Sequence, residues 1–124
     1  IGITPFMSML RHAFNTESAH RLMLIYSNRR PEDAAFLAEL QGHARQHERF
    51  QLVATMTDMD KSSQSWSGET ARIDAAFLTR VSARLASPIF YAAGPPALVA
   101  GVRAELTAAG IDDDDIRSED FSGY

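Results

Sequence analysis

The feature of this chain that most restricts its fold is the regular alternation of helix-like segments with short, compact apolar segments. Helical spacing of apolar residues is found in residues 4–15, 31–47, 73–85 and 97–109, and buried-strand patterns are found in residues 21–27, 50–55, 88–93 and 116–121. Because parallel strands need crossover connections, this order predicts an α/β fold: a doubly wound parallel sheet with helices on both faces.

Length, charge and composition narrow the function. A chain of 124 residues predicts one domain, residues 1–124. The net charge of −4 offers no basic field for nucleic acid, and no apolar run is long enough for a membrane span. With no cysteine, disulfides and iron–sulfur clusters are excluded, and we expect a cytoplasmic protein.

The chain opens on a segment typical of a helix start. Gly2 and Ile3 precede Thr4, the predicted N-cap, and Pro5 lies in the first turn. Free N–H groups and a positive helix end would suit an anion such as a pyrophosphate. The competing interpretation is a helix start without a ligand.

A second polar segment, Ser27-Asn28-Arg29-Arg30, ends a predicted buried strand. Ligands of open α/β sheets bind at the carboxyl ends of strands, and a fold that binds an unphosphorylated ribose usually offers Asp or Glu there. Donors and positive charge favour a 2′-phosphate, and therefore NADPH. Alternatively the arginines, Arg30 above all, are solvated turn residues.

A third segment, Tyr91-Ala92-Ala93-Gly94-Pro95-Pro96, ends a strand with a glycine and two prolines. Such a turn lets backbone approach a flat ring closely, although a tight turn without function has the same residues.

Taken together, the segments resemble the nucleotide domain of the ferredoxin–NADP reductase family over the whole chain. Gly2-Ile3-Thr4-Pro5 resembles the end of its glycine-rich loop, and Tyr26-Ser27-Asn28-Arg29 its adenosine-side segment. Further similarities are Trp66-Ser67-Gly68-Glu69-Thr70-Ala71-Arg72-Ile73, Ala93-Gly94-Pro95-Pro96 and the closing Glu119-Asp120-Phe121.

The resemblance implies an NAD(P)H-dependent flavin oxidoreductase in which hydride passes from NADPH or NADH to FAD or FMN, the flavin being bound by a domain not in this chain. It implies catalytic roles for Thr4, Gly94, Glu119 and Phe121, and cofactor-binding roles for Gly2, Ile3, Thr4, Pro5, Ser27, Asn28, Arg29, Arg30, Gly94, Pro95 and Pro96. The implied partners are that flavin-binding domain and an electron acceptor: ferredoxin, flavodoxin, haem or an oxygenase component. The isolated chain is expected to be inactive.

The chain departs from the family in three places. The family's first strand, the centre of its 3-2-1-4-5 sheet, has no counterpart, so we expect two unpaired inner edges, and a fragment or a partner that supplies the strand. Ala93 stands where the family has a cysteine, and Ala71 where it has a glycine.

Other interpretations remain. His43 and His47 with Glu39 have zinc-compatible helical spacing, but solvated histidines are commoner and no metal site is predicted. Asp112 to Asp115 lack the alternation of a calcium loop. A non-catalytic flavodoxin-like or nucleotide-binding interaction module is the alternative function.

Overall fold

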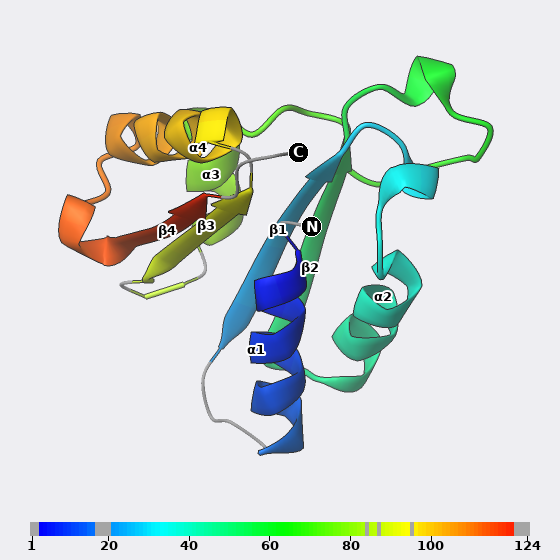
Figure 1. Cartoon of the computed structure of the whole chain (residues 1–124), viewed down its shortest axis with the longest axis horizontal. Coiled ribbons are helices and arrows are strands. Elements are labelled where there is room, and N and C mark those ends of the chain that lie inside the picture. The colour runs from blue at the N-terminus through cyan, green and yellow to red at the C-terminus, as the bar shows by residue number, and fades with distance from the viewer. Residues whose placement is uncertain (1–2, 17–20, 84, 87, 95, 121–124) are drawn as a thin grey trace. The chain divides into compact units, whose positions relative to one another are not determined.

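The computed structural model describes residues 3–16, 21–83, 85–86, 88–94 and 96–120 (Figure 1). Its helices and strands follow the predicted order. They are α1 (Thr4–Asn15), β1 (Leu22–Asn28), α2 (Leu37–Gln46), β2 (Phe50–Met56), α3 (Ala75–Ser82), β3 (Phe90–Gly94), α4 (Pro96–Ala108) and β4 (Ile116–Asp120), with 3-10 helices at Pro31–Asp33, Met59–Lys61 and Asp113–Asp115. The α/β fold class is confirmed.

The described strands form two parallel pairs. β1 pairs with β2 from Leu22 opposite Phe50 to Asn28 opposite Met56. β3 pairs with β4 from Phe90 opposite Ile116 to Gly94 opposite Asp120. Among the described residues the two pairs are separate two-stranded sheets.

The chain divides into two compact units, which are described separately. One contains Ile1–Thr16 and Ile73–Tyr124, and the other contains Glu17–Arg72. In the first unit, α4 packs against both β3 and β4 and against α3 (Figure 1). In the second unit, α2 packs against β2.

Polar groups fix the helix ends of the first unit. The Asp74 carboxylate accepts the N–H of Phe77 at 2.8 Å, and Glu105, on α4, accepts the N–H of Ala75 at 2.8 Å. Both carboxylates therefore satisfy donors that a helix start leaves unpaired. At the C-terminal end of α4, Gly110 has φ +88 and the N–H of Ile111 donates to the carbonyl of Leu106, as in a left-handed C-cap.

The prediction of one helix from Pro31 to His47 is wrong in one respect, because the segment forms two separate helices. The 3-10 helix Pro31–Asp33 and α2 are separated by Phe36, whose φ is +61. Phe36 fits the apolar spacing of the predicted helix, yet 44% of its surface is exposed, whereas Leu40 is fully buried. The break places Glu32 and Asp33 at the end of β1 rather than in the first turn of a long helix.

Candidate nucleotide-binding site

The carboxyl end of the β1–β2 pair carries Ser27 and Asn28, as predicted. Main-chain bonding continues beyond the strands, because Asn28 and Arg29 carbonyls accept the N–H groups of Thr57 and Asp58 at 2.9 Å each. The side-chain nitrogen Nδ2 of Asn28 is buried and has no hydrogen-bond partner among the described residues. A buried amide donor without an acceptor is costly, so this atom is suited to a ligand oxygen.

Next to Asn28 is the hydroxyl of Tyr26, which donates to the carbonyl of Ala35 at 3.1 Å. Burial raises the pKa of Tyr26, while the Asn28 side chain and the Ala35 backbone oppose this rise. The amide is thus close to the phenol without meeting hydrogen-bond geometry, and its Nδ2 donor stays unsatisfied.

Arg30, predicted to meet a phosphate, is occupied within the chain. Its Nε and Nη2 atoms donate to the two carboxylate oxygens of Asp33 at 2.9 Å each. Its Nη1 lies 3.9 Å from Glu32 and donates to the Lys61 carbonyl at 3.4 Å. A two-point arginine–carboxylate pair of this kind is among the stronger hydrogen-bonded contacts in proteins.

The polar stretch after β2 is hydrogen-bonded to Glu32. The Ser62 hydroxyl donates to one carboxylate oxygen at 2.7 Å, and the N–H and hydroxyl of Ser63 both donate to the other at 3.0 Å. These donors, the Ser63 N–H first, lower the pKa of Glu32 from 4.5 to about 2. The sequence analysis did not predict these contacts of Arg30 and Glu32. The spacing of Arg30 and Asp33 by three residues was a local signal for the ion pair between them.

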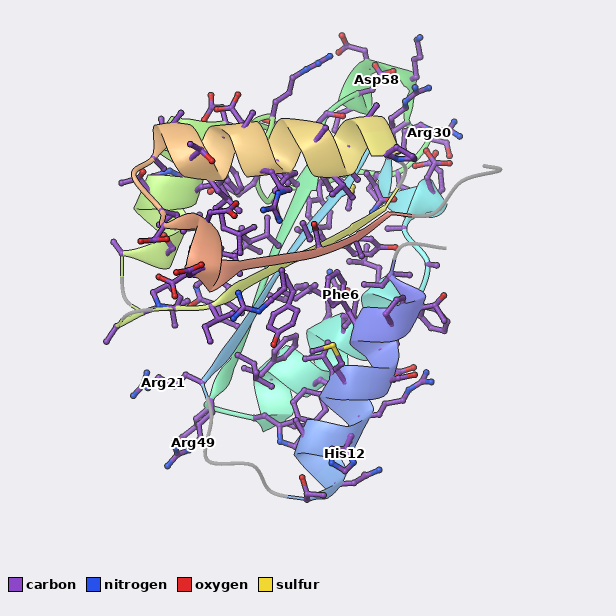
Figure 2. All side chains as sticks on the ribbon, turned by 60° about the vertical axis from the view of Figure 1, so that its left-hand side comes forward. Phe6, His12, Arg21, Arg30, Arg49 and Asp58 are labelled. Atoms are coloured by element: carbon purple, nitrogen blue, oxygen red, sulfur yellow. The ribbon has the colours of Figure 1, made fainter. Side chains whose placement is uncertain are left out.

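Arg29 differs from Arg30. Its side chain is exposed, and the described residues give it no ion pair. Figure 2 shows Arg30 and Asp58 at one end of the β1–β2 pair, with Arg21 and Arg49 at the opposite end. The described part of the second unit therefore offers Ser27, Asn28 and Arg29 at the predicted edge.

In the first unit, β3 and β4 bring two predicted segments together. Gly94 ends β3, buried and with φ +155, and Pro96 begins α4. The register places Ala93 opposite Glu119. Gly2, Pro95 and Phe121, and the side chain of Glu119, lie outside the described residues.

The start of α1 differs from the prediction by one position. Ile3 is the N-cap, without a side-chain cap bond, and Thr4 is the first helical residue, with Pro5 in the first turn. Thr4 is exposed and Ile3 is 6% exposed. The first N–H groups of a helix have no acceptor within the helix, and no side chain caps this end of α1.

The segment that begins at Trp66 covers the end of β2. The Trp66 indole donates to the Glu69 carbonyl at 2.9 Å, and the Thr55 hydroxyl donates to the Ala71 carbonyl at 2.5 Å. A Cβ on Gly68 would lie 2.8 Å from the Trp66 ring, so this glycine permits close packing. Ala71 contributes through its carbonyl, which any residue provides.

The metal alternatives find no support in the described residues. His43 Nε2 lies 3.1 Å from Glu39, and no group of three or more His, Asp or Glu side chains there could hold a metal ion. In the acidic run, Asp112 accepts the N–H of Asp114 and Asp113 pairs with Arg103 at 2.5 Å. None of the described helices is long and apolar enough to cross a membrane.

Comparison with known proteins identifies the family. Residues 1–104 match the oxidoreductase NAD-binding domain family. The chain belongs to this family, and the predicted resemblance is confirmed.

Named relatives are reductases. The chain is 32% identical over 115 residues to NADH-cytochrome b5 reductase 2 of Lodderomyces elongisporus, covering 88% of this chain and 38% of the relative. It is 27% identical over 121 residues to the glycine betaine monooxygenase reductase subunit of Chromohalobacter salexigens, covering 98% and 33%. The chain thus spans about a third of the length of these relatives.

A solved structure supports the fold. The CS-b5R domains of human Ncb5or in the NAD+ form match with a TM-score of 0.80 at 20% identity, over 94% of this chain and 33% of that one.

Proposed function

We propose that this chain is the nucleotide-binding domain of a larger flavin-dependent reductase and presents NADH or NADPH to a flavin held by another domain. The match of residues 1–104 to the NAD-binding family carries this proposal. The buried, unpartnered amide of Asn28, at the edge where ligands of α/β sheets bind, supports it.

Each group of residues has a distinct part in the proposal. Ser27, Asn28 and Arg29 hold the adenosine side, and the start of α1, with Gly2, Ile3, Thr4 and Pro5, faces the pyrophosphate. Gly94, Pro95 and Pro96 border the nicotinamide, and Glu119 and Phe121 lie toward the flavin. Bound NAD(P)H supplies the hydride; the chain's residues bind and orient, with no covalent step.

The partners follow as part of the same proposal. They are a flavin-binding domain and an electron acceptor, which the relatives' names suggest is a cytochrome or an oxygenase component. A ferredoxin or flavodoxin acceptor and a cytoplasmic location remain part of the proposal.

Calorimetric titration with ADP-ribose tests the nucleotide site. We expect binding that Asn28→Ala weakens by about two- to tenfold, the range for one hydrogen bond. Asn15→Ala, at the chain's other asparagine, serves as the matched control because Asn15 lies exposed at the end of α1. Equal affinities of the two variants would remove Asn28 from the site.

Flavin reduction tests the proposed reductase role. In the full-length protein, NADH should bleach the flavin absorbance. Nucleotide binding without bleaching would refute the reductase role and favour a non-catalytic binding module.

A further inference from the structure

Arg103 joins helix α4 to strand β4 at two points. Its Nη1 atom donates to the hydroxyl of Ser118, within β4, at 3.0 Å. Its Nη2 atom lies 2.5 Å from a carboxylate oxygen of Asp113, in the 3-10 helix that precedes β4. Because the guanidinium is planar and its N–H groups point in fixed directions, the two contacts together restrict where β4 can lie.

The position of Arg103 on α4 explains this reach. Val99, four residues before it, and Leu106, three residues after it, are buried, so all three lie on the face of α4 that packs against β3 and β4 (Figure 1). On β4, the buried Ile116 and Ser118 are two residues apart and share one face of the strand. The part-buried side chain of Arg103 therefore runs over the sheet and ends at Ser118.

The elements that Arg103 joins carry the residues proposed to lie next to the nicotinamide and the flavin. Gly94 ends β3, and α4 follows it. The register sets Glu119, the residue after Ser118, opposite Ala93. Arg103 thus holds the residue that directly precedes Glu119 in the chain.

Strand β4 depends on such contacts because it is bonded to a single strand. Among the described residues it pairs with β3 and has no second strand neighbour. A short strand that is bonded along one edge has fewer contacts to keep it in place than a central strand. Side-chain contacts from α4 therefore have a large influence on the position of β4.

We propose that Arg103 is a positioning residue for hydride transfer, because it fixes β4 and with it the backbone of Glu119. The inference rests on the proposed function, in which the turn after β3 borders the nicotinamide and Glu119 lies toward the flavin. Arg103 itself touches neither group. Its effect is on geometry, and a displacement of about 1 Å can slow an enzymatic reaction about a hundredfold.

The test measures the rate constant of flavin reduction in the full-length protein, by stopped-flow absorbance at saturating NADH. Arg103→Ala should lower this rate constant by about tenfold or more. The affinity for ADP-ribose, measured by calorimetry, should change by less than about twofold, because the proposed adenosine contacts belong to the other unit. A purely structural role would lower the stability to urea and leave the rate constant of the folded protein unchanged.

Substitutions of Ser118 repeat the test without truncating the arginine, at an exposed position where a small change does not endanger folding. Ser118→Ala should slow flavin reduction by about two- to tenfold, because the aligned position of β4 loses one hydrogen bond. Ser118→Thr keeps the hydroxyl and favours a strand, so it should keep the rate. Asp113→Asn should have the smaller effect, because Asp113 is exposed and solvent weakens its ion pair. Equal rates in Ser118→Ala and Ser118→Thr would overturn the proposal.

Arg80→Ala is the matched control. It removes an arginine from the same unit, on α3, where the guanidinium lies 5.2 Å from the ring centre of Phe77. The rate constant of flavin reduction should change by less than about twofold. An equal loss of rate in Arg80→Ala and Arg103→Ala would show a general effect of losing an arginine, and would overturn the specific role of Arg103.

A double variant tests whether Arg103 acts through Glu119. In a Glu119→Gln background, Arg103→Ala should slow flavin reduction by less than about twofold, because the residue that Arg103 positions is already altered. Slowing by the same factor as in the unaltered background would show that the two residues act independently, and would overturn the positioning role.

The rates also distinguish a failure of this inference from a failure of the proposed function. If NADH does not bleach the flavin of the unaltered protein, both are overturned. If NADH bleaches the flavin equally fast in the unaltered protein and in Arg103→Ala, only the role of Arg103 is overturned.

Discussion

Replacing Gly94 with alanine tests whether the end of β3 requires a glycine. Gly94 has φ +155, and a Cβ there would lie 2.6 Å from Cδ2 of Leu98. An alanine at such a backbone angle costs about 1–3 kcal/mol. The contact adds less, because Leu98 is 48% exposed and can change rotamer for about 0.5–1.5 kcal/mol. Alanine has a smaller unfolded-state entropy than glycine, which offsets about 0.4–1 kcal/mol of this loss of stability.

The net expectation for Gly94→Ala is a loss of about 1–3 kcal/mol of unfolding free energy, measured by urea denaturation. Substitutions at two other glycines distinguish backbone strain from side-chain contact. Gly110 has φ +88 with nothing within 4 Å of an added Cβ, and Gly101 also has nothing within 4 Å. Gly110→Ala should therefore lose about 1–2 kcal/mol from backbone strain alone. Gly101→Ala, inside α4, should gain about 0.5–1 kcal/mol.

Leu98→Ala completes the design because it removes the atom that an added Cβ would approach. If backbone strain dominates, the costs of Gly94→Ala and Leu98→Ala should add within about 0.5 kcal/mol. Full recovery of stability in the double variant would show that side-chain contact, not backbone conformation, excludes a residue larger than glycine. A Gly94→Ala variant as stable as the unaltered chain would refute both causes.

Two further predictions concern carboxylates. Asp74→Ala and Glu105→Ala each leave an N–H at the start of α3 without its acceptor, so each should cost about 1 kcal/mol in urea denaturation, and Glu105→Gln, which keeps an acceptor oxygen, should cost less. Because folding lowers the pKa of Glu32 from 4.5 to about 2, its stabilising contribution is present above pH 4.5 and is lost as the pH falls toward 2. An NMR titration should give that low pKa, and the protection factor of the Ser63 amide, its exchange rate relative to the unfolded chain at the same pH, should fall across the same pH range. The same fall in Glu32→Gln would contradict the assignment.

The sequence predicted the order and kind of the helices and strands because their signals are local. Compact apolar runs indicated β1 and β2, and the helix-like segment 97–109 indicated α4. The break at Phe36 was not predictable in this way. Glu32 and Asp33 suit a helix start, and Phe36 continues an apolar spacing. What holds the other conformation is long-range: the bond from Tyr26 to the Ala35 carbonyl, and those from Ser62 and Ser63 to Glu32.

The same distinction between local and long-range signals applies to the candidate site. Residues at strand ends could be placed by sequence, because a parallel sheet puts every carboxyl end at one edge. Whether a side chain at that edge remains available to a ligand depends on what folds over it. Asn28 keeps an unsatisfied donor, whereas two guanidinium nitrogens of Arg30 are already bonded to Asp33. Two polar residues of the same predicted segment, Asn28 and Arg30, thus differ in their capacity to bind a ligand, and the difference lies in Asp33.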